Sequence, residues 1–463
     1  MFKTFVNVFR VPELRNKILF TLMMLAIFRI GHAVPIPGLD QKHIGEIIEK
    51  QQQDQNSIGA RVAAYASLFS GGSLSHGTLF GLGVMPYISA SIIFQLLTTV
   101  VPSLEKMSKE GESGRRKIQE WTRYATVPIA ALQGLFWLKS LGAESIQSTW
   151  NGPQFWVTGI LALTAGCVFL MWIGEQIDEY GLGQGISLLI MAGIVCRMPD
   201  AIFLLFKELN FTGSADPVRT VGPGKLLTLV ALFIFVIATA ILITQAQRRI
   251  PIMQAKHTRG RKVYGGQKQY LPLKVNIGGV MPVIFASSLM LLPTIVIRFL
   301  SDRMAGDGGV VGRTLGFLSA QFGNGQFLYV LTELVMIYFF AFFWTTVQFK
   351  PKEIANNLRD YGSFIPGLRP GKRTADYLEK VMMRMTYVGA AFLCLIAIVP
   401  TVAMAQLNIN PNIAQFLGGT GLLIVVSVVL DMVQRIETNL LTRNYAGFLG
   451  AGEGGKRIKG RSN

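Results

Sequence analysis

The residues that could carry out covalent or metal chemistry are few and scattered along this chain of 463 residues. The four histidines lack the close spacing of metal ligands, and the three cysteines lie far apart within apolar runs. No phosphate-binding loop, zinc-protease helix, nucleophile elbow or dinucleotide-binding fingerprint occurs. We therefore predict that the protein is not an enzyme, holds no metal or cofactor, and depends on a partner for any work. The residues concerned are His32, His43, His76, His257, Cys167, Cys196 and Cys394.

Cations that could bind phosphates or carboxylates are concentrated in two polar segments. Residues 246–274 carry eight Lys and Arg residues and no acid, a density that suits the phosphate backbone of a large nucleoprotein. A topogenic or lipid-contacting loop is the alternative interpretation. In residues 348–381, two Pro-Gly turns at 366–367 and 370–371 would hold Arg369 at a rigid tip. We expect this second segment to be a docking knob rather than a spacer.

The elements that must position these residues are mostly apolar. Hydrophobic residues make up 51% of the chain and charged residues 15%, and the mean hydropathy is +0.42, whereas soluble domains carry about 25% charged residues. A membrane-spanning helix needs about 20 apolar residues. The sequence contains ten such runs: about 18–37, 78–101, 124–141, 153–173, 184–205, 224–245, 275–297, 326–347, 382–403 and 413–433. The first run has no small-residue cleavage site, so we interpret it as a retained helix.

Basic residues predict how these runs are oriented. The segments on one face hold 32 of the 44 Lys and Arg residues but only 14 acids, counting Arg384 at a helix edge. By the positive-inside rule this face is cytoplasmic, so both termini are expected in the cytoplasm. One short segment on this face is acidic and is the exception. The segments are 1–17, 102–123, 174–183 (the acidic one), 246–274, 348–381 and 434–463.

Ten crossings divide into two sets of five, and an odd number per half inverts the second half. We therefore predict an all-α polytopic membrane protein with ten transmembrane helices in two inverted five-helix halves. The halves are residues 1–205 and 206–433, followed by a basic cytosolic tail at 434–463. We count three charged residues inside the runs, Arg29, Glu333 and Asp431. We assign no role to Glu333.

Two further features lie at membrane depth. Residues 68–83 contain five glycines and three serines, which makes a poor spanning helix in a segment that is too apolar for an ordinary outer loop. An interfacial loop is the plain interpretation, and a re-entrant element that can occupy a pore is the functional one. Gln95 and Asn276 are polar residues in apolar runs. They either hold helices together by hydrogen bonds or mark a switchable seam between two helices.

Over nearly its whole length, the chain resembles the SecY family, the bacterial protein-conducting channel subunits. The motifs are highly specific in number, order and placement on the ten-run plan, although none is decisive alone. They are FRIGHAVPIPG (28–38), FSGG (69–72), GVMPYISASIIFQLL (83–97), KEGESGRRK (109–117), GLGQGISLLI (181–190), RRIPIMQAK (248–256), LPLKVNIGGVMPVIFASS (271–288), IPGLRPG (365–371) and GGTGLLIVVSVVLDM (418–432).

The resemblance implies that the two halves surround a central pore. Residues 68–77 match the family's plug, of which the core is Leu68, Phe69, Ser70, Gly71, Gly72, Ser73 and Leu74. The family's ring of pore-lining isoleucines falls on Val84, Ile88, Ile186, Ile190, Ile284 and Ile424. Valine at the first position would widen the ring slightly. The second and seventh runs match the lateral gate, with Gln95 and Asn276 as its polar pair.

The residues themselves add a physical argument for the ring. Val84 and Ile88 are four positions apart, as are Ile186 and Ile190, so each pair shares a helix face. Without the resemblance, all six residues would be interpreted as lipid-facing or core positions. Aliphatic side chains offer no directional bonds, so a ring of them can hold any polypeptide without sequence preference. When empty, a narrow apolar neck resists wetting and ions.

The resemblance also implies partners and a location. The two polar segments match the docking surface for ribosomes and for the motor ATPase SecA, and SecE and SecG would complete a heterotrimer. The docking residues are Arg248, Arg249, Arg259, Arg261, Lys262 (where an arginine is familiar) and Arg369. The expected function is a channel in the bacterial cytoplasmic (inner) membrane, among anionic lipids. It would pass unfolded secretory chains across the membrane and release transmembrane segments sideways between the second and seventh helices, with ring and plug sealing it at rest.

Two other classes of protein share parts of this pattern. A secondary transporter can also be built from five-plus-five inverted repeats, but it needs convergent polar groups near the membrane midplane and has little use for long basic loops. A membrane scaffold that only docks ribosomes would leave the plug-like segment unexplained. Salt-dependent binding of ribosomes or SecA by the protein with its small subunits would separate these classes.

Overall fold

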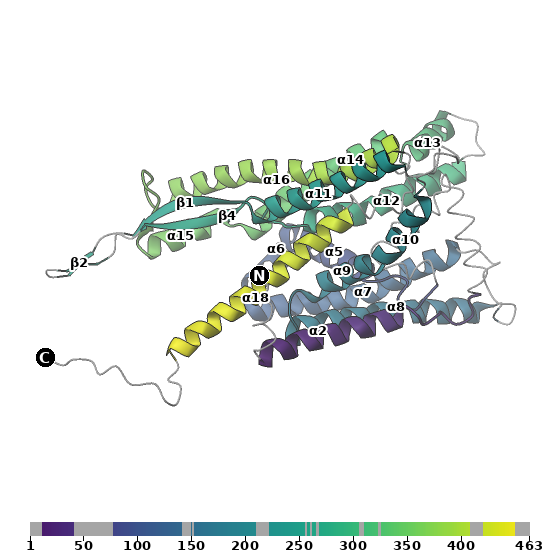
Figure 1. The fold of residues 1–463 in the computed structure, drawn as a ribbon, viewed down its shortest axis with the longest axis horizontal. Coiled ribbons are helices and arrows are strands. Elements are labelled where there is room, and N and C mark those ends of the chain that lie inside the picture. The colour runs from purple at the N-terminus through teal and green to yellow at the C-terminus, as the bar shows by residue number, and fades with distance from the viewer. Residues whose placement is uncertain are drawn as a thin grey trace.

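The computed structural model describes residues 12–40, 77–140, 150, 152–209, 222–254, 257–259, 262–264, 268–304, 310–322, 326–407 and 420–449. Within these ranges the chain is mainly helical. The helices form an elongated body, and a β-hairpin extends from one end of it (Figure 1).

In the described part of the first half, the regular elements are helices. They are α2 (Pro12–Gly31), α5 (Met85–Val100), α6 (Pro102–Lys109), α7 (Glu112–Ser140), α8 (Pro153–Tyr180), α9 (Gly185–Cys196) and α10 (Met198–Glu208). The axis bends by 99° between α5 and α6. Val101, at the bend, has extended backbone angles of −95° and 113°, because the ring of Pro102 disfavours a helical conformation in the residue before it.

The second half adds strands to the helices. Its elements are α11 (Pro223–Gln245), β1 (Gln247–Gln254), β2 (His257–Arg259), β3 (Lys262–Tyr264), β4 (Lys268–Lys274), α12 (Met281–Met304), α13 (Val310–Gln321), α14 (Phe327–Gln348), α15 (Pro351–Asp360), β5 (Ser363–Phe364), α16 (Lys372–Leu407) and α18 (Thr420–Leu449). Helix α18 continues past residue 433, where the sequence analysis placed the end of the last run.

Five helices in the described ranges are long and apolar enough to cross a membrane, or six if the bent pair α5 and α6 counts as one span. The five are Pro153–Tyr180, Gly185–Lys207, Pro223–Gln245, Phe327–Asp360 and Lys372–Val399. They make this a multi-pass membrane protein. Helices α2, α7, α12 and α18 have 20, 29, 24 and 30 residues but are not among these spans. The count of ten and the side of the termini therefore stay predictions.

The same packing pattern recurs in the two halves. In the first half α2 packs on α8 and α9, while α5 packs on α7, α7 on α8, and α8 on α9. In the second half α11 packs on α16 and α18, while α12 packs on α14, α14 on α16, and α16 on α18. Among the described residues, the most extensive contacts between the halves are those of α5 with α12 and of α9 with α18. Helices α2, α5, α7, α8 and α9 thus have counterparts with matching neighbours in α11, α12, α14, α16 and α18.

The segment 246–274, which the sequence analysis treated as a loop, is a β-hairpin. Strands β1 and β4 pair antiparallel with Ile250 opposite Leu271, and β5 adds to the other edge of β1 in a sheet of order β4-β1-β5. Along β1, Ile250 and Ile252 are buried and alternate with exposed Arg249 and Pro251. This period of two is the signature of a strand with one buried face. The buried face packs against α16 in a small satellite core.

Candidate functional site

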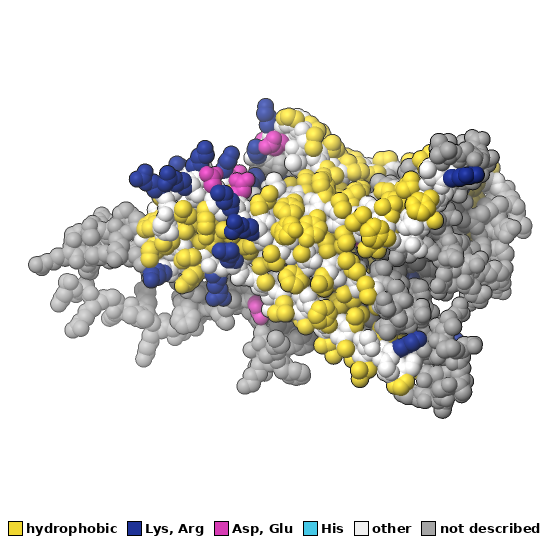
Figure 2. Space-filling model, turned by 90° about the horizontal axis from the view of Figure 1, so that it is seen from above, with side chains coloured by type: hydrophobic (Ala, Val, Ile, Leu, Met, Phe, Trp, Pro, Cys, Tyr) yellow, Lys and Arg dark blue, Asp and Glu magenta, His cyan; other side chains and the backbone are white. Residues whose placement is uncertain are grey.

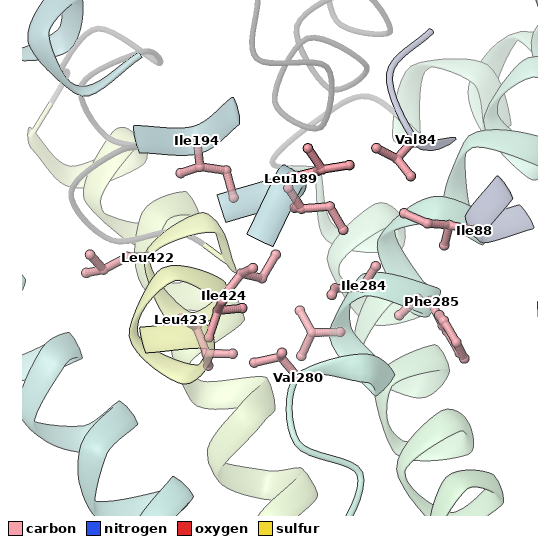
Figure 3. Close-up of a cluster of buried hydrophobic side chains, with 14 of the residues drawn as sticks. Val84, Ile88, Leu189, Ile194, Val280, Ile284, Phe285, Leu422, Leu423 and Ile424 are labelled. Carbon is pink, nitrogen blue, oxygen red and sulfur yellow. The ribbon is translucent and has the colours of Figure 1, made fainter. Parts of the chain in front are cut away.

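Six aliphatic side chains from four segments of the chain lie in one buried cluster. Five of them, Val84, Ile88, Ile190, Ile284 and Ile424, are between 1% and 6% exposed, and Ile186 packs against the same cluster half-buried. We name this set the aliphatic collar. Figure 3 shows side chains from the start of α5, from α9, from α12 and from α18 pointing toward one another. The structure thus brings together the residues that the sequence analysis expected to form a ring.

The turns before α5 fix the first two members of the collar. Gly77 and Gly83 have φ angles of +59° and +58°, a conformation that glycine adopts at little cost. The carbonyl of Val84 accepts a hydrogen bond from the amide of Ile88 at 3.1 Å, so the two side chains share one helix face. Phe80 is 2% exposed and anchors these turns, since its ring stacks near Phe28 and Phe169.

Helix α9 is held in place by close backbone contact with α8. A side chain at Gly185, the first residue of α9, would overlap the carbonyl oxygen of Gly174. The amide of Gly185 donates a hydrogen bond to Oδ1 of Asp178 at 2.7 Å, which caps the start of α9. This contact sets the height and rotation of α9, and therefore the positions of Ile186 and Ile190.

The acidic segment 174–183 departs from the basic pattern because its acids hold helices together. Glu175 on α8 forms an ion pair with Arg123 on α7, with 2.5 Å between Oε1 and Nε. Asp178 caps α9, as described above. The adjoining turn is also anchored from α2, where Oγ1 of Thr21 accepts a hydrogen bond from the amide of Leu182 at 3.0 Å. These contacts explain why acids occupy a face that is otherwise cationic.

A glycine turn positions Ile284 at the start of α12. Gly279 has a φ of +58°, and the side-chain amide of Asn276 donates to its carbonyl at 2.7 Å. The amide of Ile284 then donates to the carbonyl of Val280 at 3.2 Å. Asn276 is therefore engaged by its own turn in this structure.

The seam between α5 and α12 carries polar atoms that are not paired across it. The side-chain amide of Gln95 donates to Oγ of Ser91 on its own helix at 3.5 Å, and Asn276 bonds within its own turn. Among the described residues, Oε1 of Gln95 and Oγ of Ser288 are buried without a hydrogen-bond partner. The structure thus places Gln95 on α5 and Asn276 in the turn before α12, and no hydrogen bond joins the two side chains.

The plug residues 68–74 lie outside the described ranges, and of the expected segment 68–77 only Gly77 is described. At that end the chain is fastened to the segment after α2. Pro35 and Thr78 form an isolated antiparallel β-bridge. The amide of Ile36 donates to the carbonyl of Gly77, and the amide of Leu79 to that of Val34, both at 2.9 Å.

Those of the expected docking residues that the structure describes lie at the end of the molecule that carries the hairpin. Arg248 and Arg249 are exposed on β1. Arg259 and Lys262 are register partners in the β2–β3 pair, and Arg261 lies outside the described ranges. Figure 2 shows Lys and Arg side chains concentrated at this end, next to a broad band of hydrophobic side chains. The surface therefore divides into a cationic end and an apolar belt.

Arg369 sits exposed at the turn between β5 and α16. Gly367 and Gly371 have φ angles of +82° and +111°, which form the turn, and Oγ1 of Thr374 donates to the carbonyl of Arg369 at 2.9 Å. Ile365, which opens the turn, is buried in the satellite core under the hairpin. The backbone of Arg369 is thus fixed from both sides while its side chain faces solvent.

Two charged residues within the fifth run were missed by the sequence analysis, which counted only Arg29, Glu333 and Asp431. Arg197 is half-buried at the junction of α9 and α10, and Asp200 is exposed in the first turn of α10. Both charges can be read directly from the sequence of the run. They were missed because the mean hydropathy of the run stays high despite them. Glu333 is buried in α14 at 9% exposure, and nothing in the structure gives it a role.

The collar's chemistry is that of an aliphatic surface. It offers neither nucleophile nor acid or base, and no group of three metal-ligating side chains occurs in the part of the chain that the structure describes. Such a surface can exclude water and contact any side chain by dispersion, without directional bonds. The arrangement suits a seal or a passage rather than a reaction.

Comparison with known sequences gives a consistent result. Residues 78–433 match the family described as SecY. The protein translocase subunit SecY of Streptomyces galbus is 40% identical over 463 residues, covering 97% of this chain and 100% of the relative. That of Thermotoga maritima is 39% identical and covers 100% of both chains. That of Escherichia coli K12 is 40% identical and covers 94% of both.

Solved structures of low sequence identity share the fold. A structure described as a protein-conducting channel has a TM-score of 0.58 at 17% identity, covering 95% of each chain. A second, described as showing that the plug domain of SecY stabilises the closed state, has a TM-score of 0.61 at 19% identity and the same coverage. Sec61 in a canine ribosome–channel complex has a TM-score of 0.54 at 15% identity and 95% coverage.

Proposed function

Because this chain belongs to the SecY family, a family of channels and not of enzymes, we propose that it conducts unfolded polypeptides across the bacterial inner membrane. The observation that carries the proposal is the aliphatic collar. Its members come from both halves of the chain and lie on the helices that make the most extensive contacts between the halves, α5 with α12 and α9 with α18. A passage lined this way closes on itself when empty, and the collar can widen without breaking any polar bond among its own aliphatic side chains.

The collar's composition fits a cargo of any sequence. Dispersion contacts do not depend on the identity of the side chain that passes, and a dry aliphatic neck opposes the passage of ions. A transporter would instead need polar groups converging on a small solute. The described members of the collar offer none.

Release of membrane segments is assigned to the seam between α5 and α12. Gln95 and Asn276 make their hydrogen bonds within their own elements, so opening this seam would break no bond between the two side chains. A hydrophobic segment could then move from the collar into the lipid. The segment 68–74, with its glycines and serines, is assigned as the plug that closes the passage from one side, held at its end by the Pro35–Thr78 bridge.

The cationic end is assigned as the docking surface. Its cytoplasmic placement follows from the positive-inside rule, with both termini on the same side. We assign Arg248, Arg249, Arg259, Arg261, Lys262 and Arg369 to contacts with ribosomes and with SecA. SecE and SecG would complete the membrane complex, with secretory and membrane-protein nascent chains as cargo and anionic lipids around it. The repeated packing of the two halves supports the inverted five-plus-five plan, in which residues 1–205 correspond to 206–433.

A crosslinking experiment tests the passage. A secretory chain stalled in transit, carrying one cysteine, is oxidised with channel variants that carry Ile88→Cys, Ile190→Cys or Ile284→Cys. We expect disulfides with all three and none above background with Leu242→Cys, which is 70% exposed on α11 and faces away from the collar. The parent channel measures the background from its three buried or half-buried cysteines. Adducts as frequent at residue 242 as at the collar would contradict the proposal.

A further inference from the structure

The span Gly185–Lys207 carries a cation in its middle. Arg197 lies where α9 passes into α10, in a span whose other residues from 185 to 199 are uncharged. A charged side chain within a membrane span is costly unless it reaches water, a partner or the membrane surface. The position of Arg197 on the helix shows which of these is available.

Arg197 lies on the face of the span that carries the collar. Residues 190, 194 and 197 follow one another at spacings of four and three, so they share a helix face. Helices α9 and α10 continue as one span through the turn at Arg197, whose amide donates to the carbonyl of Ile194 and whose carbonyl accepts from the amide of Ala201, both at 3.2 Å. Seven residues separate Arg197 from Ile190, or about 10 Å along the helix axis.

The neighbours of this face are protein rather than lipid. Ile194 is 8% exposed and belongs to the same buried cluster as the collar. A Cβ atom on Gly421, in the first turn of α18, would lie 3.4 Å from Cγ2 of Ile194. Val195 points to the other side of the helix and is 42% exposed. Arg197 therefore lies on the helix face that carries Ile190 of the collar, beyond the collar along the axis.

We propose that Arg197 is a charge-selective contact for the polypeptide in transit, one that favours acidic segments and delays clusters of Lys and Arg as they leave the collar. The inference rests on the proposed channel function and its orientation, in which α9 runs from the cytoplasmic to the outer side. The guanidinium stays charged and its paired donors fit a carboxylate. Asp200 is the acid whose charge acts on it, but Asp200 is exposed, and solvent weakens such a pair.

The test uses three secretory substrates that differ only in a cluster of six residues within the mature part, made of Lys, Glu or Gln. Their transit is measured in vesicles that contain the whole channel complex, driven by SecA without a membrane potential. In the parent channel we expect the Lys cluster to pass roughly 2- to 10-fold more slowly than the Glu cluster, the range for one charge acting over several ångströms. Arg197→Gln should abolish this difference and Arg197→Glu should reverse it, with the Gln cluster little changed.

Lys207→Gln is the matched control, because it removes a cation from an exposed position on the same span and should keep the difference. The inference is wrong if Arg197→Gln keeps the parent ratio, if it slows all three substrates equally, or if Lys207→Gln has the same effect. It is also wrong if the effect of Arg197→Gln appears only in vesicles rich in phosphatidylglycerol, which would place the guanidinium among lipid headgroups. A parent channel that fails to pass even the Gln cluster contradicts the channel function itself.

Discussion

Ile424 allows the collar's sealing role to be tested with one side chain. It is 1% exposed and packs among the aliphatic side chains of α5, α9 and α12. Burying an amide without a partner costs about 1–3 kcal/mol in proteins, so Ile424→Asn should draw water into the cluster. We expect higher ion conductance of the resting channel in planar bilayers, and transport of substrates with defective signal sequences.

Val429→Asn provides the control for this variant, since Val429 is on the same helix but 40% exposed. It should leave both the conductance and the selection of signal sequences at the parent level. If Ile424→Asn leaves conductance and selection unchanged, the collar is a packing core and not a seal.

Arg369 and the cations of the hairpin should behave differently when mutated. The turn fixes the backbone of Arg369, and a guanidinium makes geometrically specific bonds that summed charge cannot replace. Arg369→Glu should therefore greatly slow SecA-driven transport while the protein remains folded. Lys268 is one of eight cations in residues 246–274, so Lys268→Ala should cost little, and added salt should weaken that surface as a whole.

Transport by purified channel in vesicles measures both variants side by side. Near-normal transport by Arg369→Glu together with severe loss from Lys268→Ala would reverse the roles assigned to the turn and the hairpin.

At the scale of residues, the sequence predicted the collar only through family resemblance. The spacing of Val84 with Ile88, and of Ile186 with Ile190, shows that each pair shares a face, but periodicity does not say which helices meet. The resemblance supplied that information, and the structure then gathers the six residues. Arg197 was overlooked because one charged residue changes the mean hydropathy of a long apolar run very little. What marks Arg197 is the face it occupies, which only the packing reveals.

At the scale of elements, the contact between α8 and α9 should tolerate no side chain. A Cβ atom at Gly185 would overlap the carbonyl of Gly174, and one at Gly174 would lie 2.6 Å from Cδ1 of Ile186. Gly185→Ala should therefore push α9 away and lower the stability by about 1–3 kcal/mol, as overpacking does. We expect a lower midpoint of thermal unfolding in detergent and a raised resting ion conductance.

Gly224→Ala is the comparison for this variant, because a Cβ atom there meets nothing within 4 Å in the first turn of α11. It should be neutral or slightly stabilising, since alanine favours a helix over glycine. Equal stability and conductance for the two variants would show that α9 can shift without disturbing the collar.

Boundaries of elements were predicted less well than their existence. The second run was expected from residue 78, but α5 begins at Met85, because three glycines at 77, 81 and 83 favour turns over helix. The hairpin was predicted as a loop because the alternation of Ile250 and Ile252 with exposed neighbours is short and lies in a segment rich in cations. The small Pro-Gly turns around Arg369 were predicted well, since their conformation is set by local sequence.

At the scale of the whole molecule, the distribution of charge was the most informative signal. The sequence assigned most of the cations to one face, and the surface shows the Lys and Arg side chains of the described residues concentrated at the end that carries β1 and β4 (Figure 2). The repeat of packing neighbours between the halves had no detectable sequence match. Helix packing depends on the shape and volume of apolar side chains, and many sequences meet that requirement equally well.

The bridge between Pro35 and Thr78 has a consequence for engineering. It joins the chain before residue 41 to the chain after residue 76, so the two ends of the stretch 41–76 are held close together. The entropic cost of closing a loop whose ends are held together rises by only about 0.6 kcal/mol for each doubling of its length. Residues 41–67, which precede the segment assigned as the plug, are therefore the place where we expect peptides of other lengths, or a reporter, to be accepted while α2 and α5 keep their positions.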